Sequence, residues 1–475
     1  MIHAIRAAVC LAVIPLVVGC GGNGPGGDSK GPDLADLPNV LLITLDTTRA
    51  DHLGVYGYRY PTSPRMDRLA DEGVVFDHAV AQASVTPVSH ASIFSGQNPY
   101  RNGLRSLHGN IGYRMSGGVP TLAEVLSERG YATGGFISAL PCGTRFGLDA
   151  GFDEFDDPFT TGEIRGGGIS GQGIVNTGTG QRTAAATNAR LFEWLDTAPS
   201  GPLFVWAHYF DPHDTRVLPE DKSDLEYIPI RGNRSRRTEL LAFYDNEIRY
   251  MDRHVGEAVD RMRSMDRPLV IAIVGDHGEG LGDHGWWSHG ILYQEQIRVP
   301  FMIVGPEVPA GKRVDSVVRT VDVAPTILTM LGFDASEAFG DIDGVDLGPL
   351  LRGESDDLGL MAYAEAITVG MNYRNPATMG VNEKKDELYV LIEGRWKYIH
   401  HRRSPAKSEL YDLEEDPREL RNRLASEPEV VKRFRAQLDA DDVLWDPSRA
   451  TRGPALSAED AKRLEDLGYI PEKNN

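Results

Sequence analysis

The sequence predicts an α/β fold with a mostly parallel central sheet flanked by helices, followed by a small α+β subdomain. The first observation is a set of short apolar runs without polar alternation, which is typical of strands buried on both faces. These runs are residues 40–45, 131–138, 203–207, 269–274 and 301–304. The second observation is that helical patterns lie between the runs, and this alternation favours a layered α/β sandwich with a mostly parallel sheet.

The N-terminal residues resemble a bacterial lipoprotein signal. Arg6 precedes an apolar run at 7–18 that is too short to cross a bilayer. The run ends in Val-Val-Gly-Cys20, which is similar to a lipobox, so we expect signal removal after residue 19 and lipidation of Cys20. A plain secretory signal with an incidental cysteine is the alternative. No aspartate follows Cys20, and the resemblance then implies the cell envelope, facing the periplasm or the exterior, with the outer membrane favoured.

The remaining elements define the expected domains. Residues 1–20 are the signal, 21–38 a Gly-rich flexible tether, 39–352 the main domain, and 353–475 the C-terminal subdomain and tail. In the main domain, Thr121 and Glu124 form a capping-box pattern for a helix that ends at Gly130. Apolar residues at helical spacing predict a long amphipathic helix over 237–265, and the Gly-rich stretch 160–186 is typical of a surface insertion.

In the subdomain, residues 388–392 and 396–399 flank Glu393-Gly394-Arg395, which predicts a hairpin. A final helix is expected near 429–438.

Charge and cysteine content exclude some functions. The formal net charge of −20 argues against nucleic acid as a partner, and an anionic ligand would need a local group of basic residues. Once a signal is removed, Cys142 is the only cysteine besides the anchor, so neither a disulfide framework nor a cysteine metal site is expected.

Thr86 is the first candidate for chemistry. It stands before Pro87 and a helix-like run that ends at Gly96, so we expect Thr86 to be the N-cap of a helix. Backbone N–H groups at a helix start favour an anion, and a hydroxyl placed there suggests phosphate or sulfate ester chemistry. An ordinary capping threonine is the alternative.

Acidic and imidazole side chains follow the predicted strands. Asp46 ends the first strand, and Asp276 and His277 end the fourth. In open α/β sheets, ligands bind beyond the carboxyl ends of strands. Two carboxylates and an imidazole suit one divalent metal ion, Mn²⁺ or Zn²⁺, with Ca²⁺ as an alternative. Histidines that gather in the strand-end loops and beside Thr86 indicate proton transfer and binding of anionic oxygens, and these are His90, His208, His213 and His289.

These segments together resemble the sulfatase family of the alkaline phosphatase superfamily. The matching segments, in family order, are 46–57, 90–96, 209–213, 275–285, 297–300, 321–326 and 409–413. The resemblance implies metal ligands at Asp46, Asp276 and His277, with the nucleophile Thr86 also on the metal. It places His213 against the substrate as an acid, His289 where many sulfatases have a lysine, and His90 where they have an arginine. We also expect Arg49 and His208 to bind substrate.

The sequence departs from the family at the nucleophile. Sulfatases oxidise Cys or Ser to formylglycine, but Thr86 is a secondary alcohol and cannot give an aldehyde, so no formylglycine is expected. We therefore expect a metal-dependent hydrolase of small anionic phosphate or sulfate esters, with phosphoesters favoured, held at a membrane by its lipid. A formylglycine-independent sulfuric ester hydrolase, a phospho-group transferase and an inactive tethered binding protein are the alternatives.

Overall fold

The computed structural model describes residues 33–105, 114–161, 175–176, 180–213, 235–367, 386–440, 443–444 and 457–466. Several sequence predictions therefore lie outside the described residues. They are the signal at 1–20 with Cys20, most of the tether at 21–38, and most of the insertion at 160–186. No helix of the described part is long and apolar enough to cross a bilayer.

The central sheet contains all five predicted strands. Its strands are β1 (Asn39–Leu45), β2 (Val74–Val80), β3 (Ala132–Phe136), β4 (Glu154–Asp156), β7 (Leu203–Tyr209), β8 (Leu269–Gly275), β9 (Arg298–Val299), β10 (Phe301–Val304) and β11 (Lys312–Arg319). Eight of them follow the order β11-β2-β10-β8-β1-β7-β3-β4, and β9 pairs with β2. The predicted mostly parallel sheet is confirmed, since β1 pairs in parallel with both β7 and β8, and β3 with β7.

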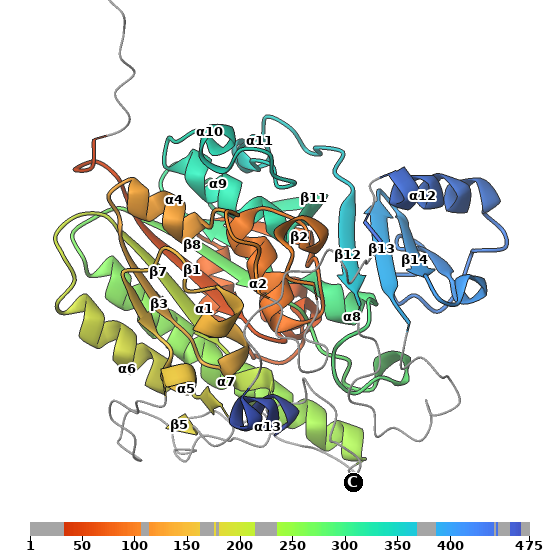
Figure 1. The fold of residues 1–475 in the computed structure, drawn as a ribbon, viewed down its shortest axis with the longest axis horizontal. Helices are drawn as coiled ribbons and strands as arrows, with labels where there is room; N and C mark the ends of the chain where they lie inside the picture. Colours follow the sequence, from red (N-terminus) through yellow and green to blue (C-terminus); the bar gives the residue numbers. More distant parts are fainter. Residues whose placement is uncertain are drawn as a thin grey trace, which may run out of the picture. The chain divides into compact units, whose positions relative to one another are not determined.

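Helices cover both faces of this sheet (Figure 1). The larger helices are α1 (Pro64–Ala70), α2 (Thr86–Ser95), α4 (Leu122–Glu128), α6 (Ala184–Leu195), α7 (Arg236–Arg263) and α9 (Val323–Met330). Shorter ones are α3 (Pro99–Asn102), α5 (Pro158–Thr161), α8 (Gln294–Ile297), α10 (Ala335–Phe339) and α11 (Gly348–Arg352), and β5 (Val175–Asn176) pairs with β6 (Gln181–Arg182).

Alternate residues of each central strand enter different cores. Val40 and Leu42 belong to a cluster with residues of α2, α4 and α9. Leu41 and Ile43 belong to a second cluster with residues of α1, α6 and α7. Burial on both faces is the reason that these strands appear as continuous apolar runs in the sequence.

The prediction of strand direction is wrong for β10. It runs antiparallel to both β8 and β2. All four of its residues are buried, and a short apolar run has the same pattern in either direction. Four strands of this sheet were not predicted from the sequence pattern, namely β2, β4, β9 and β11. The apolar run of β2 is interrupted by Asp77 and His78, and β11 is partly exposed.

Two helix predictions are confirmed closely. Thr121 caps α4 through the expected capping box with Glu124, and Gly130 adopts a positive φ of 86° after the helix. The long amphipathic helix is α7, of 28 residues, whose N-cap Ser235 accepts a hydrogen bond from the Thr238 N–H.

The C-terminal part forms a four-stranded antiparallel sheet in the order β12-β13-β14-β15, as Figure 1 shows beside the central sheet. Its strands are β12 (Ala362–Ala366), β13 (Leu388–Glu393), β14 (Trp396–His401) and β15 (Glu409–Asp412), followed by α12 (Pro428–Ala440) and α13 (Ala458–Asp466). The hairpin at Gly394, with φ of 54°, is confirmed. Residues 32–475 form one compact unit, and the boundary at 353 stays a prediction.

Candidate active site

The candidate site lies at the carboxyl ends of β8, β1 and β7. In the parallel pairing, Leu45 is in register with Gly275 of β8 and with Tyr209 of β7. The residues that follow these positions, Asp46 and Asp276, are therefore neighbours. Both are fully buried. Backbone register alone thus brings together two carboxylates that are far apart in the sequence.

Thr86 begins helix α2 and faces this pair. The expectation that Thr86 is the N-cap is wrong by one position, because Val85 is the N-cap and Thr86 already has helical geometry. Its hydroxyl donates to Asp46 Oδ2 at 3.0 Å and lies 3.1 Å from His277 Nε2. A hydrogen bond to a buried carboxylate is stronger than a bond to a backbone amide, so the side chain turns to Asp46 instead of capping the helix.

His277 is held in one tautomer. Its Nδ1 lies 2.9 Å from the Gly278 carbonyl oxygen, which can only accept, so Nδ1 carries the proton. Nε2 then presents a lone pair to the Thr86 hydroxyl. Asp46 and His277 are both acceptors, but the hydroxyl has only one proton to donate. If the hydroxyl proton is donated to Asp46, the lone pair on His277 Nε2 receives no proton. A cation between these groups would interact with that lone pair.

Unpartnered oxygens support the same conclusion. Among the described residues, Asp46 Oδ1 and Asp276 Oδ2 are buried without a hydrogen-bond partner. One ligand atom each from Asp46, Asp276 and His277 lies within 4.8 Å of the others. Burial raises the pKa of both carboxyls, and the nearby Asp46 charge raises the pKa of Asp276 further, because two negative charges without water repel. Such a donor set suits a divalent cation.

Two further hydroxyls lie at this site. Thr47 Oγ1 and Ser84 Oγ are also buried without a partner in the described part of the chain. Thr47 has a φ of 48°, which is strained for a β-branched residue. Its N–H donates to Asp276 Oδ1 at 3.2 Å.

His208 contacts Asp46, and His90 contacts the backbone of Thr86. His208 Nε2 is 3.4 Å from Asp46 Oδ2, and its Nδ1 accepts from the Ser138 N–H at 3.2 Å. His90 Nδ1 donates to the Thr86 carbonyl oxygen at 2.8 Å. Both rings are fully buried, and burial lowers the pKa of each to about 3, so both are neutral at pH 7.

His213 and His289 come together beside His277. His289 Nε2 lies 3.3 Å from His213 Nε2, and the ring centroids of His289 and His277 are 4.5 Å apart. Burial lowers the pKa of His289 to about 4. Both histidines were expected near the transferred group, and they lie next to the cluster of carboxylates and Thr86.

Arg49 does not join the side chains that converge on Thr86. Its guanidinium donates to Asp51 and Asp283 at 2.8 Å each and to the Glu279 carbonyl oxygen at 3.2 Å. Its backbone N–H donates to the Tyr244 hydroxyl at 2.9 Å. These bonds hold the loop after β1, and a role of Arg49 in substrate binding stays a prediction.

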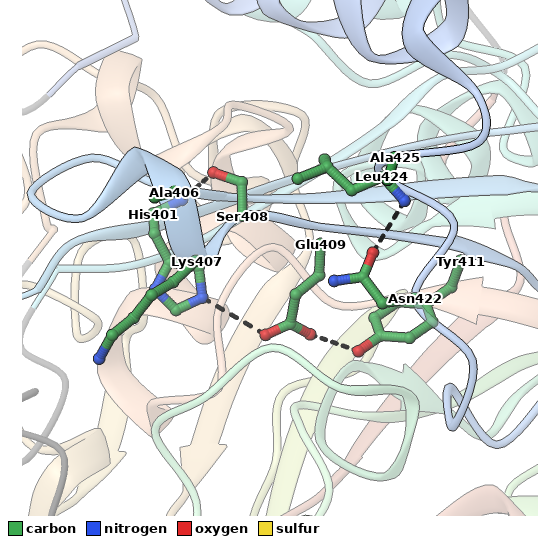
Figure 2. Close-up of a pocket in the computed structure, with 9 residues that line it drawn as sticks. All are labelled: His401, Ala406, Lys407, Ser408, Glu409, Tyr411, Asn422, Leu424 and Ala425. Atoms are coloured by element: carbon green, nitrogen blue, oxygen red, sulfur yellow. Dashed lines mark hydrogen bonds and ion pairs between the residues drawn. The ribbon is translucent and has the colours of Figure 1, made fainter.

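A separate pocket of about 700 Å³ lies on the C-terminal sheet (Figure 2). It is lined by His401, Ala406, Lys407, Ser408, Glu409, Tyr411, Asn422, Leu424 and Ala425. Its polar groups pair with one another and with their neighbours. The Tyr411 hydroxyl donates to Glu409, and His401 Nδ1 lies 2.9 Å from Asp386 Oδ2. None of the residues predicted for chemistry lines it.

Comparison with known proteins identifies relatives over most of the chain. Residues 38–333 match the sulfatase family model, and residues 282–442 match the model described as N-sulphoglucosamine sulphohydrolase, C-terminal. The chain is 24% identical to a Δ4,5-hexuronate-2-O-sulfatase of Bacteroides thetaiotaomicron, over 85% of this chain and 88% of that protein. It is 26% identical to an arylsulfatase of Clostridium perfringens, over 82% and 91%.

Among solved structures, a phosphonate monoester hydrolase of Agrobacterium radiobacter superposes with a TM-score of 0.66. The two sequences are 20% identical, and the superposition covers 86% of this chain and 96% of that one. At this identity the likeness shows a shared fold. The predicted α/β architecture is confirmed by it.

Proposed function

This chain belongs to the sulfatase family of ester hydrolases, and from that premise we propose that it hydrolyses phosphate or phosphonate esters with Thr86 as an unmodified nucleophile. The observation that carries the proposal is the position of the Thr86 hydroxyl, between Asp46 Oδ2 at 3.0 Å and His277 Nε2 at 3.1 Å. A threonine side chain cannot become formylglycine, so the unmodified hydroxyl must be the nucleophile.

The residues present fit one divalent cation. Asp46, Asp276 and His277 would hold it, with Thr86 adjacent, and the unpartnered carboxylate oxygens support this assignment. A divalent cation bound there would favour the alkoxide form of the hydroxyl and neutralise negative charge on the transferred group. With histidine as a ligand, Mn²⁺ and Zn²⁺ are preferred to Ca²⁺.

The side chains around Thr86 have separate roles in the proposed reaction. Asp46 Oδ2 accepts the Thr86 proton, and the Thr86 oxygen bonds to phosphorus while the phosphorus–oxygen bond to the alcohol breaks and the leaving oxygen takes a proton from His213. Water then attacks phosphorus and gives a proton to His213, the bond between phosphorus and Thr86 breaks, and Asp46 returns the proton to the Thr86 oxygen. His90 holds the Thr86 backbone through the carbonyl bond, and His208 orients Asp46. His213 and His289 lie beside the transferred group.

The preference for phosphorus follows from the nucleophile. A formylglycine enzyme expels sulfate by collapse of a hemiacetal, but a sulfo-threonine has no such route. Attack of water on a phospho-threonine needs no carbonyl. Sulfuric ester hydrolysis is the second candidate, because the relatives named above are sulfatases.

Matched aryl phosphate monoesters, diesters and sulfates, assayed with the same metal, test the choice. We expect kcat/KM to be higher for a phosphoester than for the sulfate, and a higher value for the sulfate would overturn the proposed preference for phosphorus.

Elemental analysis should find metal in the wild type and much less in Asp276→Ala. Equal metal content in the two proteins would refute the ligand assignment.

We also propose that Cys20 carries the lipid that holds this enzyme at the bacterial envelope, with the outer membrane favoured. The support is the Val-Val-Gly-Cys20 sequence.

A further inference from the structure

The loop that carries His289 is joined to the C-terminal subdomain through His284. This histidine lies in the turn Asp283–Gly285 with a φ of 48°, and its side chain is 15% exposed. The ring stacks on Tyr293, with centroids 3.8 Å apart and planes inclined by 5°. One ring nitrogen faces Glu295 of α8 and the other faces Glu419, which follows β15. One side chain thus connects three segments of the fold.

His284 needs two protons to make both contacts. Its Nδ1 lies 2.9 Å from Glu295 Oε1, and its Nε2 lies 3.3 Å from the Glu419 carbonyl oxygen. A carboxylate and a carbonyl can only accept hydrogen bonds, and a neutral imidazole has one N–H. Burial lowers the pKa of His284, but Glu295 and Glu419 raise it by more, so the net shift is upward from the ordinary 6.5. The geometry therefore requires the imidazolium form.

Helix α8 connects His284 to the segment that carries His289. Glu295, which contacts His284, is followed in the helix by Gln296, which is fully buried. The side-chain amide of Gln296 bonds to the backbone on both sides of His289. The two contacts are with the Ser288 carbonyl oxygen at 3.3 Å and with the Ile291 N–H at 2.9 Å. A displacement of α8 would therefore move His289.

The same helix supports the loop that follows β8. The Gln296 carbonyl oxygen accepts from the Gly278 N–H at 2.9 Å, directly after His277. A Cβ on Gly278 would overlap the Glu295 carbonyl oxygen, so the two backbones are in close contact. The position of α8 thus affects both His277 and His289.

These contacts make the position of the loop depend on one proton. When His284 becomes neutral, Nδ1 keeps its N–H for the Glu295 carboxylate, which is the stronger acceptor, and the bond from Nε2 to Glu419 is lost. We propose that His284, as an imidazolium ion, is a positioning residue that holds the loop with His289 beside His277, and that loss of its proton releases this loop from the C-terminal subdomain.

The direction of the pH dependence follows from the contacts. Because the folded state raises the pKa of His284, its stabilising effect is complete below the ordinary value of 6.5 and is lost as the pH rises through the higher value in the folded protein. Turnover should therefore fall on the alkaline side. The effect on turnover rests on the proposed function, whereas the contact between the loop and the subdomain does not.

The other charged and titratable groups around His284 are paired with one another. The pairs are Asp283 with Arg49 and Arg237, Glu419 with Lys397, and Tyr293 with Glu409, which also contacts His401. Carboxyl, phenol, lysine and arginine groups ordinarily titrate well away from neutral pH. A proton lost from this contact just above neutral pH therefore comes from His284.

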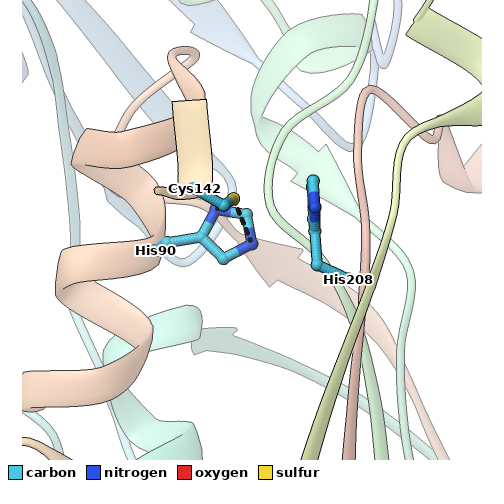
Figure 3. Close-up of side chains that lie close together, drawn as sticks. All are labelled: His90, Cys142 and His208. Atoms are coloured by element: carbon cyan, nitrogen blue, oxygen red, sulfur yellow. Dashed lines mark hydrogen bonds between the residues drawn. The ribbon is translucent and has the colours of Figure 1, made fainter. Parts of the chain in front are cut away.

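The buried histidines near Thr86 do not cause this alkaline change. His90 and His208 lie close together with Cys142, as Figure 3 shows, and their ligand atoms lie within 4.8 Å of one another. Burial lowers the pKa of both imidazoles to about 3, and that of His289 to about 4. These rings are already neutral at pH 7, so a further rise in pH leaves their charge unchanged.

Glu295→Gln is the decisive variant, because glutamine keeps an acceptor for Nδ1 and removes the charge. Loss of an opposite charge at this distance should lower the pKa of His284 by about 1 or more. Ring ¹⁵N NMR of histidine-labelled protein measures that pKa, and His284→Asn assigns the signal. The alkaline fall of kcat/KM for an aryl phosphate should move down by the same amount. Glu257→Gln is the matched control, because it removes a carboxylate 2.7 Å from His254 on α7 and should leave both measurements unchanged.

A second variant and a second measurement keep the test decisive. His284→Asn should be reduced at neutral pH to the activity that the wild type reaches on the alkaline side. Amide hydrogen exchange of residues 283–296, compared at one pH just above the wild-type pKa of His284, should be faster in both variants than in the wild type and in Glu257→Gln.

Three results separate this proposal from the proposed function. An alkaline fall that stays in place in Glu295→Gln while the pKa of His284 drops belongs to another group, such as His213, and overturns the proposal. Equal exchange in all four proteins also overturns it. A wild type that hydrolyses none of the esters refutes the proposed function, and NMR and exchange then still decide whether His284 holds the loop.

Discussion

Replacing Tyr244 by Phe should weaken both the fold and metal binding. Tyr244 lies on α7, is fully buried, and bonds to the loop that carries Asp46. Its hydroxyl donates to the Thr47 carbonyl oxygen at 2.6 Å and accepts from the Arg49 N–H at 2.9 Å. The substitution removes one oxygen atom and leaves two buried backbone groups without this partner.

The expected cost follows from these two bonds. A buried donor or acceptor that loses its partner costs about 1–3 kcal/mol, so two such groups should lower the free energy of unfolding by about 2–6 kcal/mol. The same bonds restrain Thr47 at its positive φ of 48°, directly after the ligand Asp46. Loss of a group that orients a ligand typically lowers metal affinity about 10–100-fold, and we expect a change in that range.

Guanidinium unfolding and metal titration of the stripped protein measure the two effects. Tyr131→Phe is the matched control, because its hydroxyl donates to the Pro38 carbonyl oxygen at 3.1 Å at the opposite end of β1. It should lose about 1 kcal/mol of stability and keep its metal affinity. A Tyr244→Phe protein that loses less than about 0.5 kcal/mol, or that binds metal like the control, would refute the reasoning.

Four further changes have defined outcomes. Thr86→Ala should lose about three or more powers of ten in kcat while Thr86→Ser keeps measurable turnover, and peptide mass spectrometry should find Thr86 unmodified; a fully active Thr86→Ala would contradict the mechanism. Lys397→Met should cost about 3–5 kcal/mol, because it leaves Glu419 charged in a fully buried pair 2.6 Å apart, and Lys397→Met/Glu419→Gln should be more stable than the single variant in urea unfolding. His213→Ala should reduce kcat/KM more for esters with poor leaving groups than for activated aryl esters; a uniform loss would argue against a role at the leaving oxygen. Cys20→Ala should abolish partitioning into detergent, and unchanged partitioning would exclude the lipid anchor.

The sequence by itself determined the layers of the fold and the residue types of the site. Continuous apolar runs such as 40–45 and 269–274 exist because both faces of a central strand are buried, and that pattern is local. The strand-end residues Asp46, Asp276 and His277 could be grouped from the sequence alone, because parallel strands bring their carboxyl ends to one edge.

Only the tertiary structure decided direction, register and contact. The short run of β10 is equally apolar in both directions, and its pairing with β8 and β2 made it antiparallel. Thr86 is not the N-cap, because its hydroxyl donates to the buried carboxylate of Asp46, 40 residues away in sequence. The 3.3 Å approach of His213 to His289 depends on two loops that share no local pattern. Contacts between distant residues arise from how the layers pack, and no local sequence periodicity encodes them.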